Sequence, residues 1–231
     1  MTSTHQSDSA SKGARKKILV VDDHPLMRAG LTQLINKQSG LEVCGEAGSP
    51  AEAKGKIPKL RPDLILADIT MKEGSGLEFI KDVQAVHGHI PILVVSMHDE
   101  KIYAERALRA GARGYIMKEQ SGEHLLTALQ RVLGGGIYLS EGMSARMLQS
   151  MAGTKSGSPE SPFQQLTDRE FEVFQLIGRG KTTEEIAAQL HISPKTVDVH
   201  RARIKEKLFL DNSTALVHYA AHWVSAQAGS A

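Results

Sequence analysis

Five side chains suited to binding or transferring a phosphoryl group follow short apolar runs of the chain. Asp22 and Asp23 follow one run, Asp68 a second, Ser96 a third and Lys118 a fourth. If these runs are the strands of a parallel sheet, their carboxyl ends meet at one edge, which is where such sheets bind ligands. The sequence therefore predicts one shared polar crevice.

The residue types in this crevice favour metal-assisted phosphoryl chemistry. Clustered carboxylates repel one another unless a cation neutralises them, and Mg²⁺ binds carboxylate, carbonyl and phosphate oxygens together with water. We expect Asp22 and Asp23 to hold the metal and Asp68 to attack phosphorus, forming an acyl phosphate. Lys118 and the Ser96 hydroxyl would then bind the phosphoryl oxygens. Any one of the aspartates taken alone is more commonly a helix cap, so the joint placement of five groups carries the prediction.

Apolar runs and amphipathic stretches alternate through the first half of the chain. The runs are Ile18–Val21, Leu41–Cys44, Leu64–Ala67, Ile90–Val95 and Gly114–Met117. Helical spacing occurs at 24–37, 50–60, 76–86, 100–110 and 121–133. Nearly continuous apolar strands are typical of a parallel sheet covered on both faces. An α/β domain with a flavodoxin-like (βα)5 doubly wound fold is predicted for residues 16–135.

The remainder of the chain changes character. Residues 136–163 read as a linker that contains a possible short helix, since 152–162 are small, polar and proline-bearing. A small all-α domain is expected over 164–228, with helices at 168–178, 183–190, 194–208 and 213–226. Capping boxes precede the first two helices, and Ser193-Pro194 begins the third. Only three residues separate the second and third helices, which indicates a helix-turn-helix.

The third helix of this domain is basic. Residues 191–208 contain five basic and two acidic residues. Val197 and Ile204 form an apolar stripe that should face the other helices, and the opposite side combines small, methyl-bearing and basic side chains suited to a DNA major groove. A solvated basic face is the alternative interpretation. The candidate DNA-binding residues are Lys195, Thr196, Asp198, Val199, Arg201, Ala202, Arg203 and Lys205.

Length and composition exclude several classes of protein. A chain of 231 residues favours two modest domains over one. With 41% hydrophobic and 23% charged residues, it is neither wholly disordered nor fibrous. No apolar run reaches the roughly 18 residues of a membrane span, so no membrane association is expected. The single cysteine, Cys44, cannot form an internal disulfide, which suggests a reducing cytoplasm. Residues 1–15 are predicted to form a disordered tail.

The motifs of the first domain resemble those of a response-regulator receiver domain. The resemblance rests on Asp22-Asp23 after the first run, Asp68, Val95-Ser96 and Gly114–Lys118. It implies that Asp68 is the phosphoacceptor, and that the carboxylates of Asp23 and Asp68 with the Thr70 carbonyl ligate Mg²⁺ while Asp22 assists through water. It also implies that Ser96 and Tyr115 are a switch pair, and that Thr70 and His98 occupy positions that tune the lifetime of the acyl phosphate. Lys72 stands where the family usually has proline.

The second domain resembles the LuxR-type helix-turn-helix, so that the whole chain resembles a NarL/FixJ-type response regulator. The resemblance implies a sensor histidine kinase and double-stranded DNA as partners, and a homodimer in the active state. In related domains the positions of Asp198, Val199 and Ala202 can face base edges. This chain lacks the basic residues that some relatives have at these positions, so few base contacts are expected. Phosphate contacts are expected from Lys195, Arg201, Arg203 and Lys205.

Two alternative functions follow from the same residues. A phosphohydrolase with an aspartyl-phosphate nucleophile usually has a second carboxylate two residues after that nucleophile, where this chain has Thr70. A phosphorylation-independent DNA-binding regulator with a vestigial acidic pocket is the other alternative, and Lys72 is the one residue in its favour.

Overall fold

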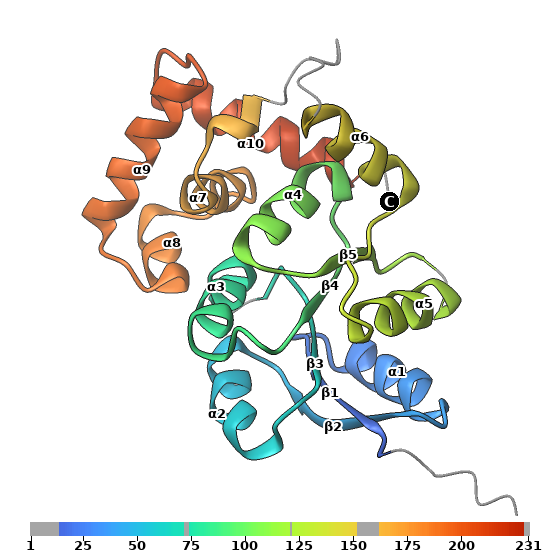
Figure 1. Ribbon diagram of the computed structural model, residues 1–231. Coiled ribbons are helices and arrows are strands. Elements are labelled where there is room, and N and C mark those ends of the chain that lie inside the picture. The colour runs from blue at the N-terminus through green and yellow to red at the C-terminus, as the bar shows by residue number, and fades with distance from the viewer. Residues whose placement is uncertain (1–13, 72–73, 121, 152–161, 229–231) are drawn as a thin grey trace, which may run out of the picture.

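The computed structural model describes residues 14–71, 74–120, 122–151 and 162–228. Within these ranges, five parallel strands form one sheet in the order β2-β1-β3-β4-β5 (Figure 1). The strands are β1 Lys16–Val21, β2 Leu41–Ala47, β3 Leu64–Ala67, β4 Ile92–Ser96 and β5 Gly114–Met117. The predicted doubly wound α/β fold is therefore confirmed. Most of the predicted disordered tail and Lys72 lie outside the described residues.

Five helices cover the two faces of this sheet. Alternate strand residues point to opposite faces, so Ile18 and Val20 belong to one apolar cluster and Leu19 and Val21 to the other. The helices on the first face are α1 Pro25–Asn36 and α5 Gly122–Leu133, and those on the second are α2 Pro50–Leu60, α3 Gly76–His87 and α4 Glu100–Ala110 (Figure 1).

Strand register brings the ends of the strands together. Val21 of β1 pairs with Ala67 of β3, and the next residue along β3 is tied to β1 because the Asp68 N–H donates to the Val21 carbonyl at 2.8 Å. At the other side of the sheet, the Lys118 N–H donates to the Ser96 carbonyl at 2.8 Å. The side chains after these strands consequently share one edge of the sheet.

The C-terminal domain consists of short, well-capped helices. After α6 Glu141–Met151, its elements are the 3-10 turn η1 Pro162–Gln165 and the helices α7 Asp168–Gly178, α8 Thr183–Leu190, α9 Pro194–Lys207 and α10 Ser213–Ala228. The capping boxes predicted for the first two full helices are confirmed at Thr167 and Thr182. Ser193 caps α9, and His191 turns the chain between α8 and α9 with a φ of 54°. This is the predicted helix-turn-helix.

The apolar core continues from the sheet domain into the helical domain. The cluster that holds α3 and α4 on the sheet also contains buried residues of α7, α8, α9 and α10. Figure 1 shows α7 beside α4 and α8 near α3, whereas α9 lies at the outer edge of the molecule. None of the helices in the described ranges combines the length and apolar character that a bilayer span requires.

Candidate functional site

An ion-paired cluster occupies the sheet edge where the phosphoryl site was expected. The Lys118 ammonium lies 2.6 Å from Asp68 Oδ2 and 2.6 Å from Asp22 Oδ2. All three side chains are almost completely buried. Burial alone would lower the pKa of Lys118, but attraction by Asp68 and hydrogen bonds to both carboxylates outweigh it and raise that pKa. The lysine therefore stays charged and holds Asp68 in a fixed position.

Asp68 has one oxygen on the lysine and the other on the following loop. Its Oδ1 accepts a hydrogen bond from the Thr70 N–H at 3.0 Å. Burial raises the pKa of the Asp68 carboxyl, and the positive charge of Lys118 opposes that rise. Asp68 is thus a buried carboxylate that needs a cationic neighbour to remain ionised.

A group of side chains suitable for binding a cation adjoins this pair. Asp22, Asp23, His24 and Asp68 each offer a ligand atom, and these atoms all lie within 4.8 Å of one another. Three of the four are carboxylates, the donor type that Mg²⁺ prefers. The donor set therefore fits the predicted Mg²⁺ site.

His24 was not among the predicted site residues. Its Nδ1 lies 2.8 Å from Asp23 Oδ1 and 3.1 Å from Asp22 Oδ1. Its position next to the paired aspartates was the signal that could have identified it, and its half-exposed ring borders the cluster on the solvent side.

The two predicted switch residues are both connected to the backbone of His98. Ser96 is buried, and its Oγ accepts a hydrogen bond from the His98 N–H at 3.2 Å. The Tyr115 ring is also buried, and its hydroxyl donates to the His98 carbonyl at 2.7 Å. Burial raises the pKa of Tyr115, and a hydrogen bond with Ser96 works against that rise. The structure therefore brings Ser96 and Tyr115 together around one loop residue.

The candidate DNA-binding face of α9 is open to solvent. Val197 and Ile204 are fully buried against the neighbouring helices, as the apolar stripe predicted. The exposed candidates are Lys195, Asp198, Val199, Ala202 and Arg203, and the half-buried ones are Thr196, Arg201 and Lys205. Among the described residues, no ion pair involves any of the four candidate cations of this face. Their charges are therefore available to a polyanion.

The other end of α9 is fixed to α7. Lys207 lies 2.7 Å from Glu170 Oε2, and the same oxygen accepts a hydrogen bond from the Thr167 N–H at 2.8 Å. Glu170 is thus both part of the capping box of α7 and an ion-pair partner of α9. Lys207 consequently has a structural role that separates it from the free cations of α9.

Arg106 of α4 is the main polar contact between the two domains. Its guanidinium donates to the carbonyls of Phe163 and Leu166 and lies 2.9 Å from Asp168 Oδ1 at the start of α7. The guanidinium carbon also lies 4.5 Å from the centre of the Phe171 ring. Only 9% of Arg106 is exposed, so water stabilises its charge little. The two carbonyls and the Asp168 carboxylate stabilise it instead.

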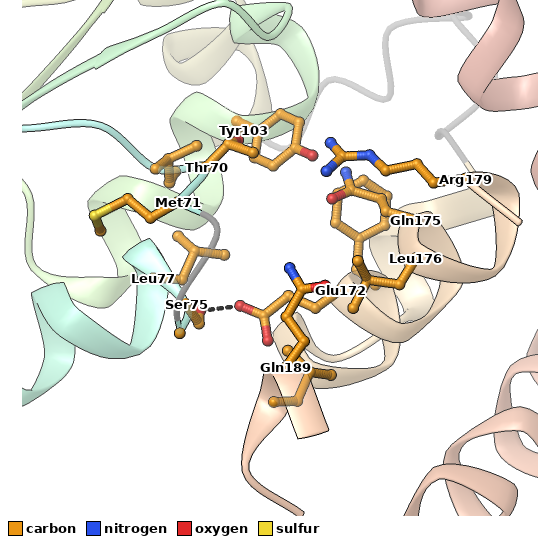
Figure 2. Close-up of a pocket in the computed structure, with 14 residues that line it drawn as sticks. Thr70, Met71, Ser75, Leu77, Tyr103, Glu172, Gln175, Leu176, Arg179 and Gln189 are labelled. Carbon is orange, nitrogen blue, oxygen red and sulfur yellow. Dashed lines mark hydrogen bonds between the residues drawn. The ribbon is translucent and has the colours of Figure 1, made fainter. Parts of the chain in front are cut away.

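A small pocket lies between the domains and is lined in part by Tyr103 and Phe171 (Figure 2). On one wall, the Ser75 hydroxyl at the start of α3 donates to Glu172 of α7. Burial raises the pKa of Glu172 to about 7, while Arg169, 3.0 Å away, opposes this rise. On the other wall, Figure 2 shows the Tyr103 hydroxyl directed toward Gln175 and Arg179.

Sequence reasoning did not identify this interface. Arg106 and Tyr103 have the spacing of an ordinary amphipathic helix. Glu172 and Arg169 resemble any i, i+3 pair on a solvated helix. The one unusual feature of the sequence was the concentration of aromatic residues in the C-terminal domain. There Phe171 contacts the single tryptophan, Trp223.

Comparisons with known proteins agree with both halves of this structure. Residues 18–130 match the response regulator receiver domain, and residues 164–220 match the bacterial regulatory proteins of the luxR family. The chain is 34% identical to the oxygen regulatory protein NreC of Staphylococcus carnosus over 208 residues, which cover 88% of this chain and 96% of NreC.

Solved structures give the same result. RcsB from Salmonella enterica, bound to the promoter rprA in the presence of the phosphomimetic BeF3⁻, is similar with a TM-score of 0.67 at 24% identity, over 90% of this chain and 98% of that one. A LuxR-family two-component response regulator from Aurantimonas is similar with a TM-score of 0.56 at 29% identity, over 60% of this chain and 99% of that one. This chain belongs to the NarL/FixJ-type response regulators, which are DNA-binding proteins rather than enzymes.

Proposed function

We propose that phosphorylation of Asp68 by a sensor histidine kinase switches the binding of this regulator to specific promoter DNA. The observation that carries the proposal is the buried placement of Asp68, whose carboxylate is held between the Lys118 ammonium and the Thr70 N–H. One carboxylate oxygen would form a bond to phosphorus while the bond from phosphorus to the histidine nitrogen breaks.

The side chains around Asp68 support this chemistry. Mg²⁺ would be held by Asp23, Asp68 and the Thr70 carbonyl, with Asp22 assisting through water, and when bound it supplies positive charge to the phosphoryl oxygens. Lys118 would exchange its contact with the Asp68 carboxylate for one with the phosphoryl group. The Ser96 hydroxyl would donate to another phosphoryl oxygen.

The DNA contacts proposed are those of α9. Lys195, Arg201, Arg203 and Lys205 would bind phosphates, and Asp198, Val199 and Ala202 would face base edges with Thr196 beside them. The relative RcsB is bound to DNA as dimers, which supports a homodimer for the active form of this chain. Two copies of α9 would then enter successive major grooves, about 34 Å apart.

The exposure of α9 indicates how the two domains are coupled. Because the receiver domain leaves the DNA-binding face of α9 uncovered, inhibition cannot consist of simple occlusion. The contacts of α4 with α7 instead fix the orientation of the C-terminal domain. We propose that phosphorylation releases these contacts, so that two C-terminal domains can pair on DNA. In this account residues 16–135 are the receiver domain, 136–163 the linker and 164–228 the DNA-binding domain.

Labelling of Asp68 variants tests the assignment of the phosphoacceptor. The full chain, incubated with Mg²⁺ and a radiolabelled small phosphodonor, should incorporate label, and Asp68→Asn should incorporate none. Asp63→Asn is a matched control, because Asp63 is a partly exposed carboxylate paired with Lys16 at the opposite end of the sheet. Retained label in Asp68→Asn would show that another residue accepts the phosphoryl group.

A further inference from the structure

His98 is held by both residues of the proposed switch. Its N–H donates to Ser96 Oγ at 3.2 Å and its carbonyl accepts from the Tyr115 hydroxyl at 2.7 Å. A movement of Ser96 toward a phosphoryl group on Asp68 would therefore displace the His98 backbone. Since the Tyr115 hydroxyl donates to the His98 carbonyl, a movement of that ring would displace the same residue.

The side chain of His98 continues from this loop toward the DNA-binding domain. Its ring stacks on the Tyr103 ring of α4, with centroids 4.8 Å apart and planes inclined by 24°. The Tyr103 ring in turn contacts Phe171 of α7 edge to face, with centroids 5.4 Å apart. Aromatic pairs at these separations are favourable beyond the area they bury. Three rings therefore form a continuous stack from the switch loop to α7.

Phe171 is well placed to respond at the far end of this stack. It is fully buried, and its ring lies under the Arg106 guanidinium at 4.5 Å and beside Trp223 at 5.4 Å. Any shift of Tyr103 therefore acts on the same ring that Arg106 covers. The stack and the Arg106 contacts therefore meet at Phe171, between α4 and α7.

We propose that His98 and Tyr103 are positioning residues that transmit the phosphorylation state of Asp68 to the DNA-binding domain through their stacked rings and Phe171. This inference rests on the proposed function, because it explains how a switch at Asp68 reaches α7. It gives His98 a role that differs from tuning the lifetime of the acyl phosphate. In the unphosphorylated chain the stack is intact and the domains are held together; displacement of His98 breaks the first ring pair and weakens the second.

The chemical state of the two rings agrees with such a role. Burial, together with the nearby positive charges of Arg179 and Lys118, lowers the pKa of His98 to about 4. The imidazole is therefore neutral at physiological pH and interacts as an aromatic ring. The Tyr103 hydroxyl has no hydrogen-bond partner in the described part of the chain, so that residue also contributes through its ring.

Two pairs of variants separate the rings from everything else at these positions. His98→Phe and Tyr103→Phe keep an aromatic ring, whereas His98→Ala and Tyr103→Leu remove it. The backbone hydrogen bonds of residue 98 are available in both members of the first pair. The measured quantity is the ratio of DNA affinities of the full chain with and without beryllofluoride and Mg²⁺.

The two aromatic variants should keep the wild-type ratio. His98→Ala and Tyr103→Leu should lower it about three- to tenfold, because their unphosphorylated forms already bind DNA more tightly. Acetyl phosphate labelling of Asp68 and the rate of label loss should remain near wild type in Tyr103→Leu. A structural defect alone would lower affinity in both states and leave the ratio unchanged.

Wild-type ratios in both His98→Ala and Tyr103→Leu would overturn the inference while leaving the proposed function intact. Loss of coupling in Tyr103→Phe equal to that in Tyr103→Leu would also overturn it, since the hydroxyl would then be the active group. A wild-type chain whose DNA affinity ignores beryllofluoride would instead contradict the proposed function itself.

Discussion

Replacing Arg106 with methionine should release the DNA-binding domain without phosphorylation. The substitution removes three charge-assisted contacts, two to the carbonyls of Phe163 and Leu166 and one to Asp168, while it keeps an apolar stem near Phe171. Breaking a buried charged contact of this kind costs about 3 kcal/mol. Because 1.4 kcal/mol is a factor of ten, the equilibrium between the held and the released arrangement should move by about two orders of magnitude.

Two assays measure this shift. Unphosphorylated Arg106→Met should bind promoter DNA with the affinity of the phosphorylated wild-type chain. The fluorescence of Trp223, whose ring lies 5.4 Å from Phe171 at the interface, should change in the same direction as it does on addition of beryllofluoride. While the domains are still held together, Asp168 also pairs with Lys81 of α3 at 2.8 Å, so the substitution does not leave Asp168 without a cation in that arrangement.

Arg109→Met is the matched control on the same helix. The Arg109 side chain is 71% exposed and pairs with Glu105 one turn away, and such surface pairs contribute little. Its DNA affinity and Trp223 fluorescence should equal those of the wild type. If Arg106→Met also behaves as the wild type in both assays, the interface does not restrain DNA binding and the reasoning is refuted.

Three further predictions follow from individual contacts. Glu172 is protonated more readily in the buried interface, where its pKa is about 7, than when exposed. Protonation therefore stabilises the held arrangement of the domains at pH values below the ordinary pKa of a glutamate, and this stabilisation is lost as the pH rises to 7. DNA binding by the unphosphorylated chain should accordingly strengthen across this window by up to about tenfold per pH unit. In a fluorescence-anisotropy titration, corrected for the effect of pH on the labelled DNA alone, Glu172→Gln should remove this pH dependence. Lys195→Ala and Arg203→Ala should each reduce the slope of log affinity against log salt concentration by about one. An unchanged slope would show that the replaced residue does not contact a phosphate. Gly178→Ala should lower the stability of the C-terminal domain by about 1–3 kcal/mol in thermal unfolding, because a Cβ there would clash with a backbone oxygen of α10. Gly30→Ala is the control and should not be destabilising, because no atom lies within 4 Å of a Cβ at that position.

The sheet and its site were predictable because each depends on short-range patterns. Apolar runs of four to six residues marked the strands, and a parallel register places residues at their carboxyl ends together whatever the loops between them do. Asp68 and Lys118 lie 50 positions apart in the chain, but each directly follows a strand. Capping residues such as Thr167 and Ser193 fixed the helix starts for the same local reason.

The interface between the domains was not predictable in this way. Tyr103, Arg106 and Phe171 have the spacing of ordinary core and surface positions, and only the docking of α7 on α4 brings them together. The final helix, α10, shows the same limit, because its sequence pattern is compatible with either a core face or an exposed face. Leu216 and Ala220 are fully buried within the domain, which the helical pattern alone did not decide.

The affinity of the full chain for promoter DNA, measured with and without beryllofluoride and Mg²⁺, tests the central claim most directly. The measurement compares the wild type with Asp68→Asn at several salt concentrations. The account predicts a gain of affinity for the wild type and no gain for Asp68→Asn. It also predicts a similar salt slope per bound chain in both states, because the receiver domain leaves the face of α9 that carries the cations uncovered. Equal affinities of the wild type in the two states, or the same gain in Asp68→Asn, would contradict it.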